Sequence, residues 1–465
     1  MSEEIKFFAI PTRGRPAALS QAADSYIKNF EAYGRRMNFV VADNSERASM
    51  NEEYRSIVKA LSARTETARY FGPAEKNIFS ERLAHASGVD RLTVDYTLGG
   101  GSPGEFAAGG NRNLLLLLTA GHKLLMCDDD TRCELYRTAK ADPKRAESSR
   151  APDPTHVVPF ATLEEAKAAL TPLQINFARA HESVLGATVE NVRVRLSFSG
   201  TAGDSGFFRP TFLLWLMGEG RERLMRDAPT FYDLMTSRQI VRSVDRTTFA
   251  RVGFCVSASL GLDNRSLLPP FLPVTRGEDF LFARLLGTTE ARALSAFLPF
   301  QIVHAPAEDR RHTVADIVNT GYSIAPFMVM VFGLDEVKPD TGRSPEESLK
   351  LAGRRLNEMV SWTDSELVDF AHQHHRATVD HQQKTLERLV DSQAVKPDFW
   401  VEQINLLLTS NAKAVTDRYH CFGGPFTEGL SELESVKKIR GLIAKTANTL
   451  IAWPELIQAA KTLGG

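Results

Sequence analysis

Three consecutive carboxylates follow an apolar run in the first third of this 465-residue sequence. Asp128, Asp129 and Asp130 come directly after Lys123–Cys127, whose composition predicts a buried strand. Buried carboxylates are costly unless a positive group neutralises them, and Mg²⁺ or Mn²⁺ prefers hard oxygen ligands. Since alternate residues of a strand point to the same side, Asp128 and Asp130 could address one ion. A solvated acidic turn in which an Asp caps a helix explains the triplet equally well.

Arginine and asparagine side chains lie at two other predicted boundaries between elements. Arg13 and Arg15 come just after a strand predicted at residues 6–10, and a guanidinium offers a planar fork that suits phosphate. The run from Gly109 to Asn113 opens a predicted helix, where free backbone N–H groups favour an anion. The alternatives are an exposed turn in the first case and ordinary helix capping by Asn111 in the second.

Two more carboxylates and two histidines lie further along the chain. Glu278 and Asp279 precede an apolar helical run, where paired acids either complement the helix dipole or supply a general base. His304 ends a strand-like run at residues 300–303, and His312 follows it. Either imidazole, in its neutral form, could complete a metal site.

Strand and helix signals alternate along the first part of the chain. Apolar β-rich runs occur at residues 6–10, 39–42, 68–71 and 123–127, and helical patterns lie at about 19–30, 51–63, 75–86 and 114–120. This alternation predicts an α/β fold with a mostly parallel sheet flanked by helices. Ligands bind beyond the carboxyl ends of such strands. Because Arg13, Asp43 and Asp128 all follow strands, we expect them to share one pocket.

The remaining segments predict loops, one more strand and a helical region. Residues 99–101 are rich in glycine, residues 138–150 predict a surface excursion or linker, residues 192–198 alternate like a strand, and residues 199–206 predict a flexible loop. From about residue 333 onward the pattern is helical. The expected organisation is a first domain at 1–332, with an insertion near 138–190, and a helical C-terminal domain at 333–465.

The bulk composition excludes several classes of protein. There are 56 basic and 57 acidic residues, so the chain lacks the basic excess of a non-specific nucleic-acid binder. Its apolar runs are far shorter than the ~18 residues of a transmembrane helix, and its start lacks the basic region of a signal peptide. Four cysteines without a Cys-x-x-Cys pair predict reduced thiols in a cytoplasmic protein.

In their order along the chain, these residues resemble the family 2-type glycosyltransferases with the GT-A fold, over roughly the first two-thirds of the sequence. In that family the opening strand ends in a Pro-Thr-x-x-Arg-like loop, and the second strand ends in an acid that contacts the nucleotide base. A helix lining the donor site opens with Ala/Gly-x-Arg-Asn, and the next strand ends in an Asp-x-Asp metal motif. A Glu-Asp pair and a metal-binding histidine follow. The matching residues here are Pro11, Thr12, Arg13, Asp43, Arg112, Asp128, Asp129, Asp130, Glu278, Asp279 and His304.

The resemblance implies a transferase that moves a sugar from a nucleotide-sugar donor to a hydroxyl or thiol. Asp128, Asp130 and His304 would hold Mn²⁺ or Mg²⁺. Asp279 would deprotonate the acceptor and Glu278 would orient it, as in inverting members, although some members with this metal motif retain configuration. The remaining matches would line the donor site: Pro11, Thr12, Arg13, Asp43, Arg112 and Asp129, with Asp128. A UDP-sugar is favoured and a GDP-sugar is the alternative, and the acceptor would be a glycan, a peptide or a small molecule.

The resemblance leaves part of the chain without a counterpart. The segment between the acidic triplet and Glu278 is long, and the helical region after residue 332 could bind acceptor, form a homodimer or dock a partner protein.

Two other functions share the expected fold. A sugar nucleotidylyltransferase should carry a glycine-rich loop with a phosphate-binding lysine after the first strand, where this chain has Arg13 and Arg15. A non-catalytic binding protein should have lost the acidic ligands, which this chain retains.

Overall fold

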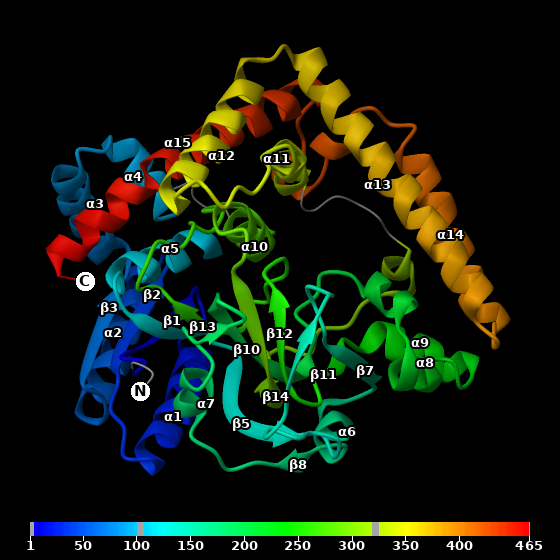
Figure 1. Ribbon diagram of the computed structural model, residues 1–465, viewed down its shortest axis with the longest axis horizontal. Helices are drawn as coiled ribbons and strands as arrows, with labels where there is room; N and C mark the ends of the chain where they lie inside the picture. The colour runs from blue at the N-terminus through cyan, green and yellow to red at the C-terminus, as the bar shows by residue number, and fades with distance from the viewer. Residues whose placement is uncertain (1–3, 100–106, 319–324, 465) are drawn as a thin grey trace.

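The computed structural model describes residues 4–99, 107–318 and 325–464 (Figure 1). Its first part is a parallel sheet in the order β3-β2-β1-β4, formed by β1 (Phe7–Thr12), β2 (Asn38–Asp43), β3 (Thr67–Phe71) and β4 (Lys123–Cys127). The connecting helices are α1 (Pro16–Ala32), α2 (Ala48–Leu61), α3 (Pro73–Ser87), α4 (Arg91–Thr97) and α5 (Ala108–Leu118). These elements confirm the strands and helices predicted for this part of the chain. Of the predicted glycine-rich loop, Gly100 and Gly101 lie outside the described residues.

The second part of the sheet is mixed. Strand β13 (Ser259–Asp263) runs antiparallel to β4, and β10 (Val192–Asp204) runs antiparallel to β13. Strand β10 is in turn parallel to β14 (Leu294–His304), which pairs with β12 (Thr247–Arg251) and β5 (Thr131–Arg137). The molecule is therefore an α/β protein with a mixed sheet, and its parallel half is the half that was expected from the alternating pattern.

The prediction of a loop at residues 199–206 is wrong for most of its length, because β10 continues to Asp204. Its glycines lie where neighbouring strands come unusually close. A Cβ on Gly200 would lie 2.3 Å from the carbonyl oxygen of Arg242, and one on Gly203 would lie 2.3 Å from that of His304. These glycines therefore allow neighbouring strands to pair closely. The prediction had taken them as a sign of a flexible loop.

The segment expected as an insertion near 138–190 contributes to the same sheet. Strand β6 (Ala146–Ser149) pairs with β12, so the surface excursion predicted at 138–150 is in part a short, exposed edge strand. Strand β7 (His156–Phe160) pairs with β11 (Gln239–Ser243), which pairs with β10. Helices α6 (Leu163–Ala168) and α7 (Phe177–Glu182) and the short strands β8 (Thr171–Pro172) and β9 (Thr188–Val189) complete the segment.

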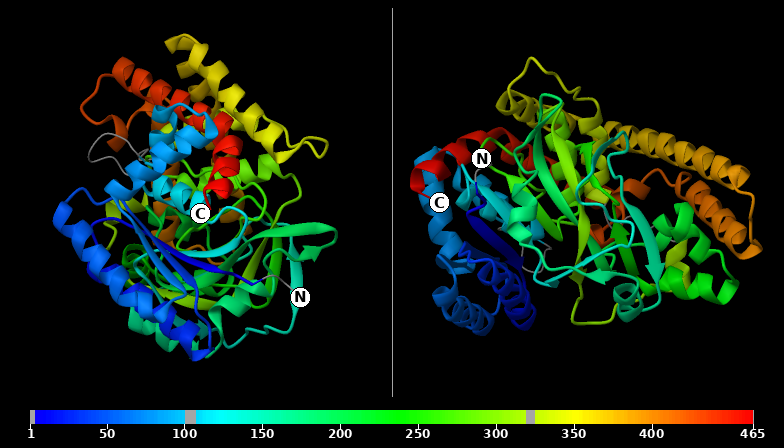
Figure 2. Two further views of the ribbon diagram at one scale, coloured as in Figure 1. Left: turned by 90° about the vertical axis from the view of Figure 1, so that its left-hand side faces the viewer. Right: turned by 60° about the horizontal axis from the view of Figure 1, so that its bottom comes forward.

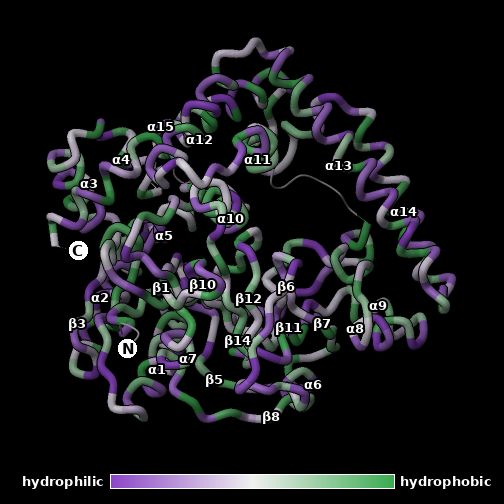
Figure 3. Tube along the Cα trace, viewed as in Figure 1, coloured by the Kyte–Doolittle hydropathy of each residue, from purple (hydrophilic) through white to green (hydrophobic). Residues whose placement is uncertain are grey.

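Helices cover both faces of the sheet, because successive strand residues point to opposite sides. Phe8, Ile10 and Val41 pack under α1 and α2, whereas Ala9 and Val40 belong to the core on the other face. That second core includes residues of α5, of α10 (Glu278–Thr289) and of the C-terminal helices. In Figure 3 the hydrophobic residues gather on the strands and on the helices that cover them.

The C-terminal region is helical, as predicted, and arches over the sheet (Figures 1 and 2). It comprises α11 (Ala325–Asp335), α12 (Pro345–Ser361), α13 (Asp364–Ser392), α14 (Asp398–Ala414) and α15 (Glu432–Leu463). Helix α15 packs against α3, α4, α5 and α12, and Trp453 donates a 2.6 Å hydrogen bond to the carbonyl of Leu268. At the other end of the arch, α14 shares a small core with α8 (Gly218–Leu224) and α9 (Ala228–Ser237). The domain boundary expected at residue 332 falls within α11.

Two expectations from composition can be compared with the structure. Across the described ranges, no helix is both long enough and apolar enough to cross a membrane. All four cysteines are free thiols, three of them buried.

Candidate functional site

The acidic triplet directly follows β4, and two arginines neutralise it. Arg15, from the loop after β1, lies 2.6 Å from Asp129 and 2.8 Å from Asp130. Arg112, from the start of α5, is buried and lies 2.8 Å from Asp128. The carboxylates therefore reach the edge of the sheet beside guanidinium groups, which offset much of the cost of burying them.

Asp129 holds the surrounding loops together. It is fully buried, and its carboxylate accepts a 2.6 Å hydrogen bond from the hydroxyl of Thr12. The hydroxyl of Tyr54 in α2 lies 3.0 Å from the same Thr12 oxygen, so β1, α2 and the triplet meet at one point. Burial raises the pKa of Asp129 to about 7, and the charge of Arg15 opposes this rise. The position gives Asp129 a supporting role, and its contact with a donor stays a prediction.

His304, at the end of β14, meets Asp130. Its Nδ1 donates a 2.6 Å hydrogen bond to the backbone carbonyl of Asp204, and its Nε2 lies 3.2 Å from Oδ1 of Asp130. This position is set by the pairing of β14 with β10, in which His304 lies opposite Gly203. Burial alone would raise the pKa of Asp130, but His304 and Arg15 hold it well below its usual range.

His312 lies apart from the triplet. Its backbone N–H donates a 2.8 Å hydrogen bond to the carbonyl of Thr236. Burial, followed by the nearby charge of Arg238, lowers the pKa of His312 to about 4. Of the two histidines considered as metal ligands, His304 is therefore the one placed beside an acidic side chain of the triplet.

Asp130 and His304 offer two of the ligands that a divalent cation needs. Because Nδ1 of His304 donates to a carbonyl, Nε2 faces the carboxylate, which is the orientation that metal-binding histidines adopt. Two ligands about 2.1 Å from an octahedral ion lie about 3 Å from each other, close to the 3.2 Å between Nε2 and Oδ1. Across residues 4–99, 107–318 and 325–464, no group of three or more His, Cys, Asp or Glu has the spacing of a metal site. Asp128, the third predicted ligand, pairs with Arg112 instead and does not form such a group with Asp130 and His304. A cation at Asp130 and His304 would therefore have to take its other ligands from water and substrate phosphates.

Glu278 and Asp279 open α10, as predicted. Glu278 is only 8% exposed, whereas Asp279 is more accessible and accepts a 2.9 Å hydrogen bond from the backbone N–H of Phe280. Burial raises the pKa of both carboxylates, that of Glu278 to about 7, and the charge of Arg112 opposes the rise. A carboxylate with a raised pKa is suited to accept a proton near neutral pH. Since Asp279 is the more accessible of the two, it is better placed to meet an acceptor.

Glu278→Gln is expected to stabilise the protein at pH 8 by on the order of 1–3 kcal/mol. The fold holds the pKa of Glu278 at about 7, above its ordinary value of 4.5, so ionisation costs more in the folded chain than in the unfolded chain. The stability linked to this group is therefore fully present below pH 4.5 and is lost as the pH rises through 7. Glutamine does not ionise, so the increase in the free energy of unfolding relative to the wild type should be large at pH 8 and small at pH 5. Urea unfolding of the wild type and the variant at pH 5 and pH 8 measures this increase. An equal increase at the two pH values would contradict the assignment of a raised pKa to Glu278.

A cavity of about 1060 Å³ lies beside the loops that follow β1 and β2. Its walls come from these loops, from α3 and α4, and from the C-terminal helix α15. Polar and charged side chains supply much of the lining, among them Arg13, Asn44, Ser45, Lys76, Lys445 and Asn448. The volume is at the upper end of the range for small-molecule sites and is sufficient for a nucleotide.

Asp43 lies behind the wall of this cavity. It is fully buried, and its carboxylate accepts hydrogen bonds of 2.8 Å and 2.5 Å from the N–H and hydroxyl of Ser45 and of 2.8 Å from Tyr70. The neighbouring Asn44 and Ser45 line the cavity, and of the predicted loop residues Arg13 does so, while Pro11 and Thr12 are buried. Asp43 therefore supports the cavity wall, and its contact with a nucleotide base stays a prediction.

Lys76, in α3, connects the cavity with the strand ends. Its buried ammonium group donates hydrogen bonds to the side-chain oxygens of Asn44 and Asn111. Asn111 in turn donates a 3.0 Å hydrogen bond to the backbone carbonyl of Thr12. Burial lowers the pKa of Lys76 to about 7, although the charge of Asp43 opposes this. Asn111 thus acts inside α5 rather than as its cap.

Neither Lys76 as a site residue nor the contacts of Asp204 were predicted from the sequence. Lys76 lies in an ordinary helical pattern, and Asp204 lies in the segment expected as a loop. The signal available for Asp204 was its position after glycines, which suggested flexibility instead. The pairing of Arg15 with two carboxylates has no local signature, because 114 or more residues separate the partners along the chain.

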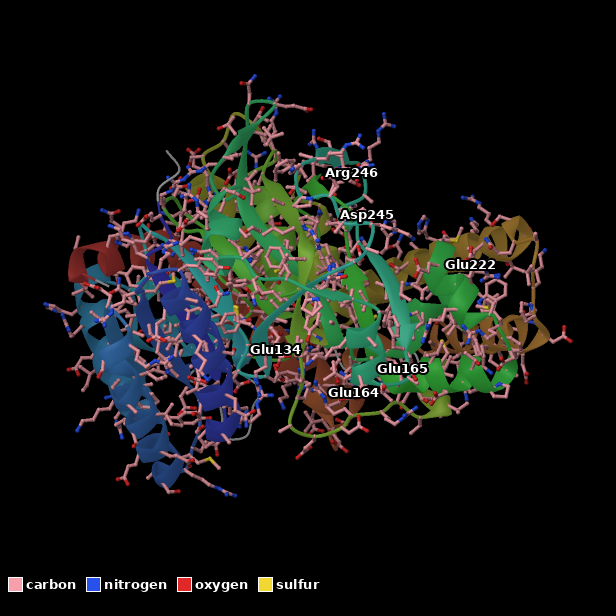
Figure 4. The ribbon with its side chains drawn as sticks, turned by 90° about the horizontal axis from the view of Figure 1, so that it is seen from below. Glu134, Glu164, Glu165, Glu222, Asp245 and Arg246 are labelled. Carbon is pink, nitrogen blue, oxygen red and sulfur yellow. The ribbon has the colours of Figure 1, made fainter. Side chains whose placement is uncertain are left out.

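Other acidic side chains lie at the surface and form ordinary ion pairs. Figure 4 labels Glu134, Glu164, Glu165 and Glu222 around β5, α6 and α8. Glu134 lies 2.6 Å from Lys167, and Glu165 lies 3.1 Å from Arg223. Exposed pairs of this kind contribute little to stability. They are ordinary surface contacts and do not form a second candidate site.

Neither a protein-family model nor a curated protein matches the chain.

Proposed function

We propose that this protein is a metal-dependent glycosyltransferase that moves a sugar from a nucleotide-sugar donor to a hydroxyl or thiol. The observation that carries the proposal is the meeting of Asp130 with His304, whose Nε2 lies 3.2 Å from the carboxylate although 174 residues separate them. The loop of Arg13 and Arg15 connects this pair with a cavity large enough for a nucleotide. The parallel strand ends that carry these loops also favour the finer assignment to the GT-A fold.

In this proposal the cavity binds the nucleoside, and UDP is favoured over GDP as the nucleotide of the donor. Asn44, Ser45 and Arg13 line the part of the cavity nearest the strand ends. Arg15 and Arg112 hold the triplet in position by the ion pairs described above. A divalent cation, Mn²⁺ or Mg²⁺, would neutralise negative charge on the departing nucleoside diphosphate.

Asp279 acts as the general base. It takes the proton of the acceptor hydroxyl or thiol as the acceptor atom bonds to the anomeric carbon, and the bond from that carbon to the diphosphate breaks. Arg112 links the two halves of the site, because it pairs with Asp128 and its charge acts on both Glu278 and Asp279. Glu278 lies deeper and orients the acceptor or its neighbour.

The proposal is tested by incubating the full chain with Mn²⁺ and a panel of nucleotide sugars and measuring nucleoside diphosphate release. We expect release from at least one donor, and a rise in melting temperature with the matching nucleoside diphosphate. Asn448→Trp, on the α15 wall of the cavity, should weaken nucleotide binding at least about tenfold, or ~1.4 kcal/mol.

Gln458→Trp is the matched control, since Gln458 is exposed on the same helix but does not line the cavity. It should bind nucleotide as the wild type does. The absence of release and of binding for every donor would overturn the proposed function. If Asn448→Trp binds nucleotide as tightly as the wild type, the cavity is not the nucleotide-binding site.

A further inference from the structure

Arg15 bridges two carboxylates of the acidic triplet. One nitrogen of its guanidinium group lies 2.6 Å from Oδ1 of Asp129, and another lies 2.8 Å from Oδ2 of Asp130. The remaining oxygen of Asp130, Oδ1, lies 3.2 Å from Nε2 of His304. Both oxygens of Asp130 are therefore engaged, and one positively charged group contacts Asp129 and Asp130 together.

A divalent cation at Asp130 would lie very close to this guanidinium group. Such a cation lies about 2.1 Å from a ligand oxygen, and Arg15 contacts the same carboxylate at 2.8 Å. Two positive charges so close to each other repel strongly, and the repulsion is larger where water is excluded. Water is largely excluded here, because Asp129 is fully buried and Asp130 is 6% exposed. If the guanidinium group moved away, the oxygens that it contacts could serve the cation instead.

Arg15 is able to move away, whereas the second arginine of the triplet is fixed. The side chain of Arg15 is 45% exposed, while that of Arg112 is 4% exposed and pairs with Asp128. Arg15 is also the residue before α1, where a positive charge opposes the helix dipole. Its backbone is held independently of its side chain, because its N–H donates a 2.6 Å hydrogen bond to the hydroxyl of Tyr54. The guanidinium group can therefore turn into solvent while the loop keeps its place.

We propose that Arg15 is a built-in competitor of the divalent cation. It neutralises Asp129 and Asp130 when no cation is bound, and it turns into solvent when Mn²⁺ or Mg²⁺ binds Asp130 and takes over this neutralisation. Because the ion pairs of Arg15 must break first, the cation binds more weakly than it would to free carboxylates. The competition sets the cation concentration at which the site becomes loaded. The inference concerns the regulation of the site and rests on the cation of the proposed function.

Mn²⁺ is the probe, titrated into the full chain by calorimetry without nucleotide or acceptor. Arg15→Gln should bind Mn²⁺ at least about ten times more tightly than the wild type, because no ion pair has to break. Arg15→Lys should lie between the two, since a single ammonium group cannot bridge two carboxylates as a guanidinium fork does. Arg55→Gln is the matched control, which removes the same charge from an exposed pair with Glu75 at 2.8 Å. It should bind Mn²⁺ as the wild type does.

A supporting role and a competing role of Arg15 predict different results. If Arg15 only holds the carboxylates in position for the cation, Arg15→Gln and Arg15→Lys should bind Mn²⁺ no more tightly than the wild type, and this result would overturn the inference. An equal gain in Arg15→Gln and Arg55→Gln would also overturn it, because the loss of net charge alone would then explain the gain. Melting temperatures verify folding, and Arg15→Lys carries the test if Arg15→Gln does not fold.

The same titration separates this inference from the proposed function. Mn²⁺ binding requires no sugar transfer, so a chain that shows the expected affinities but releases no nucleoside diphosphate from any donor would contradict the proposed function alone. An active wild type whose Mn²⁺ affinity is unchanged by Arg15→Gln would contradict this inference alone. Absence of Mn²⁺ binding from both the wild type and Arg15→Gln would overturn the competition and the metal dependence together.

Discussion

Asp279→Asn is expected to lower the rate of sugar transfer by about 10²–10⁴-fold, the range contributed by a positioned general base. Asparagine keeps the shape of the side chain and can still accept the 2.9 Å hydrogen bond from the N–H of Phe280, but it cannot take a proton. Donor binding should be unchanged, because Asp279 does not line the nucleotide cavity. Single-turnover transfer and equilibrium binding of the nucleoside diphosphate, measured side by side, separate the two effects.

The pH profile provides a second measurement on the same residue. Burial raises the pKa of Asp279 and raises that of the adjacent Glu278 to about 7, so the pair loses its protons at a higher pH than free carboxylates do. A base works only when deprotonated. We therefore expect kcat/KM to rise with pH through the near-neutral range rather than near pH 4, and this rise to be absent from the residual activity of Asp279→Asn.

The control for Asp279→Asn is Asp398→Asn, which makes the same change in the first turn of α14, outside the site. It should transfer sugar at the wild-type rate. Wild-type turnover by Asp279→Asn would place the base elsewhere, and a loss of donor binding equal to the loss of rate would make Asp279 a binding residue instead.

Asp130→Ala and removal of divalent metal are expected to have equally large effects, each reducing nucleoside diphosphate release by about 10³-fold, or ~4 kcal/mol. The reason is that Asp130 and His304 are the acidic and imidazole side chains whose spacing fits two ligands of one cation. A chelator should abolish activity of the wild type, and added Mn²⁺ should restore it. In Asp130→Ala, added Mn²⁺ should restore little, because one ligand is gone.

Asp245→Ala is the control, since this side chain lies at the β11–β12 turn on the surface seen in Figure 4. It should respond to chelator and Mn²⁺ as the wild type does. Full activity of Asp130→Ala, or of the chelated wild type, would exclude the cation from the reaction and leave Arg15 and its neighbours as the groups that neutralise the diphosphate.

The alternating pattern of the first part of the chain was sufficient to predict its elements. Apolar runs at β1, β2 and β4 ended where the structure ends them, within a few residues, because a strand buried on both faces needs a continuous apolar run. Because these strands are parallel, the loops that follow them were expected at the same edge of the sheet. For the same reason the position of Asp128 after β4, and of Glu278 and Asp279 at the start of α10, was predicted correctly.

Long-range pairing could not be predicted in this way. Residues 199–204 have the composition of a loop, yet they extend β10 because the adjacent strands approach where Gly200 and Gly203 have no side chain. The expected anion site at the start of α5 is also altered, because the backbone N–H of Gly110 donates to the carbonyl of Pro273. The side-chain amide of Asn111 donates to the carbonyl of Thr12. Both outcomes depend on partners that lie far away in the sequence.

By itself the sequence determined the types of side chain available at each strand end and the faces that had to be buried, because both depend on local composition and periodicity. Only the tertiary structure decided which charges meet. Arg15 pairs with Asp129 and Asp130, Arg112 pairs with Asp128, and Asp130 lies beside His304, with separations of up to 174 residues. Electrostatic energy depends on distance in space and on burial, and neither is encoded in the local pattern of residues.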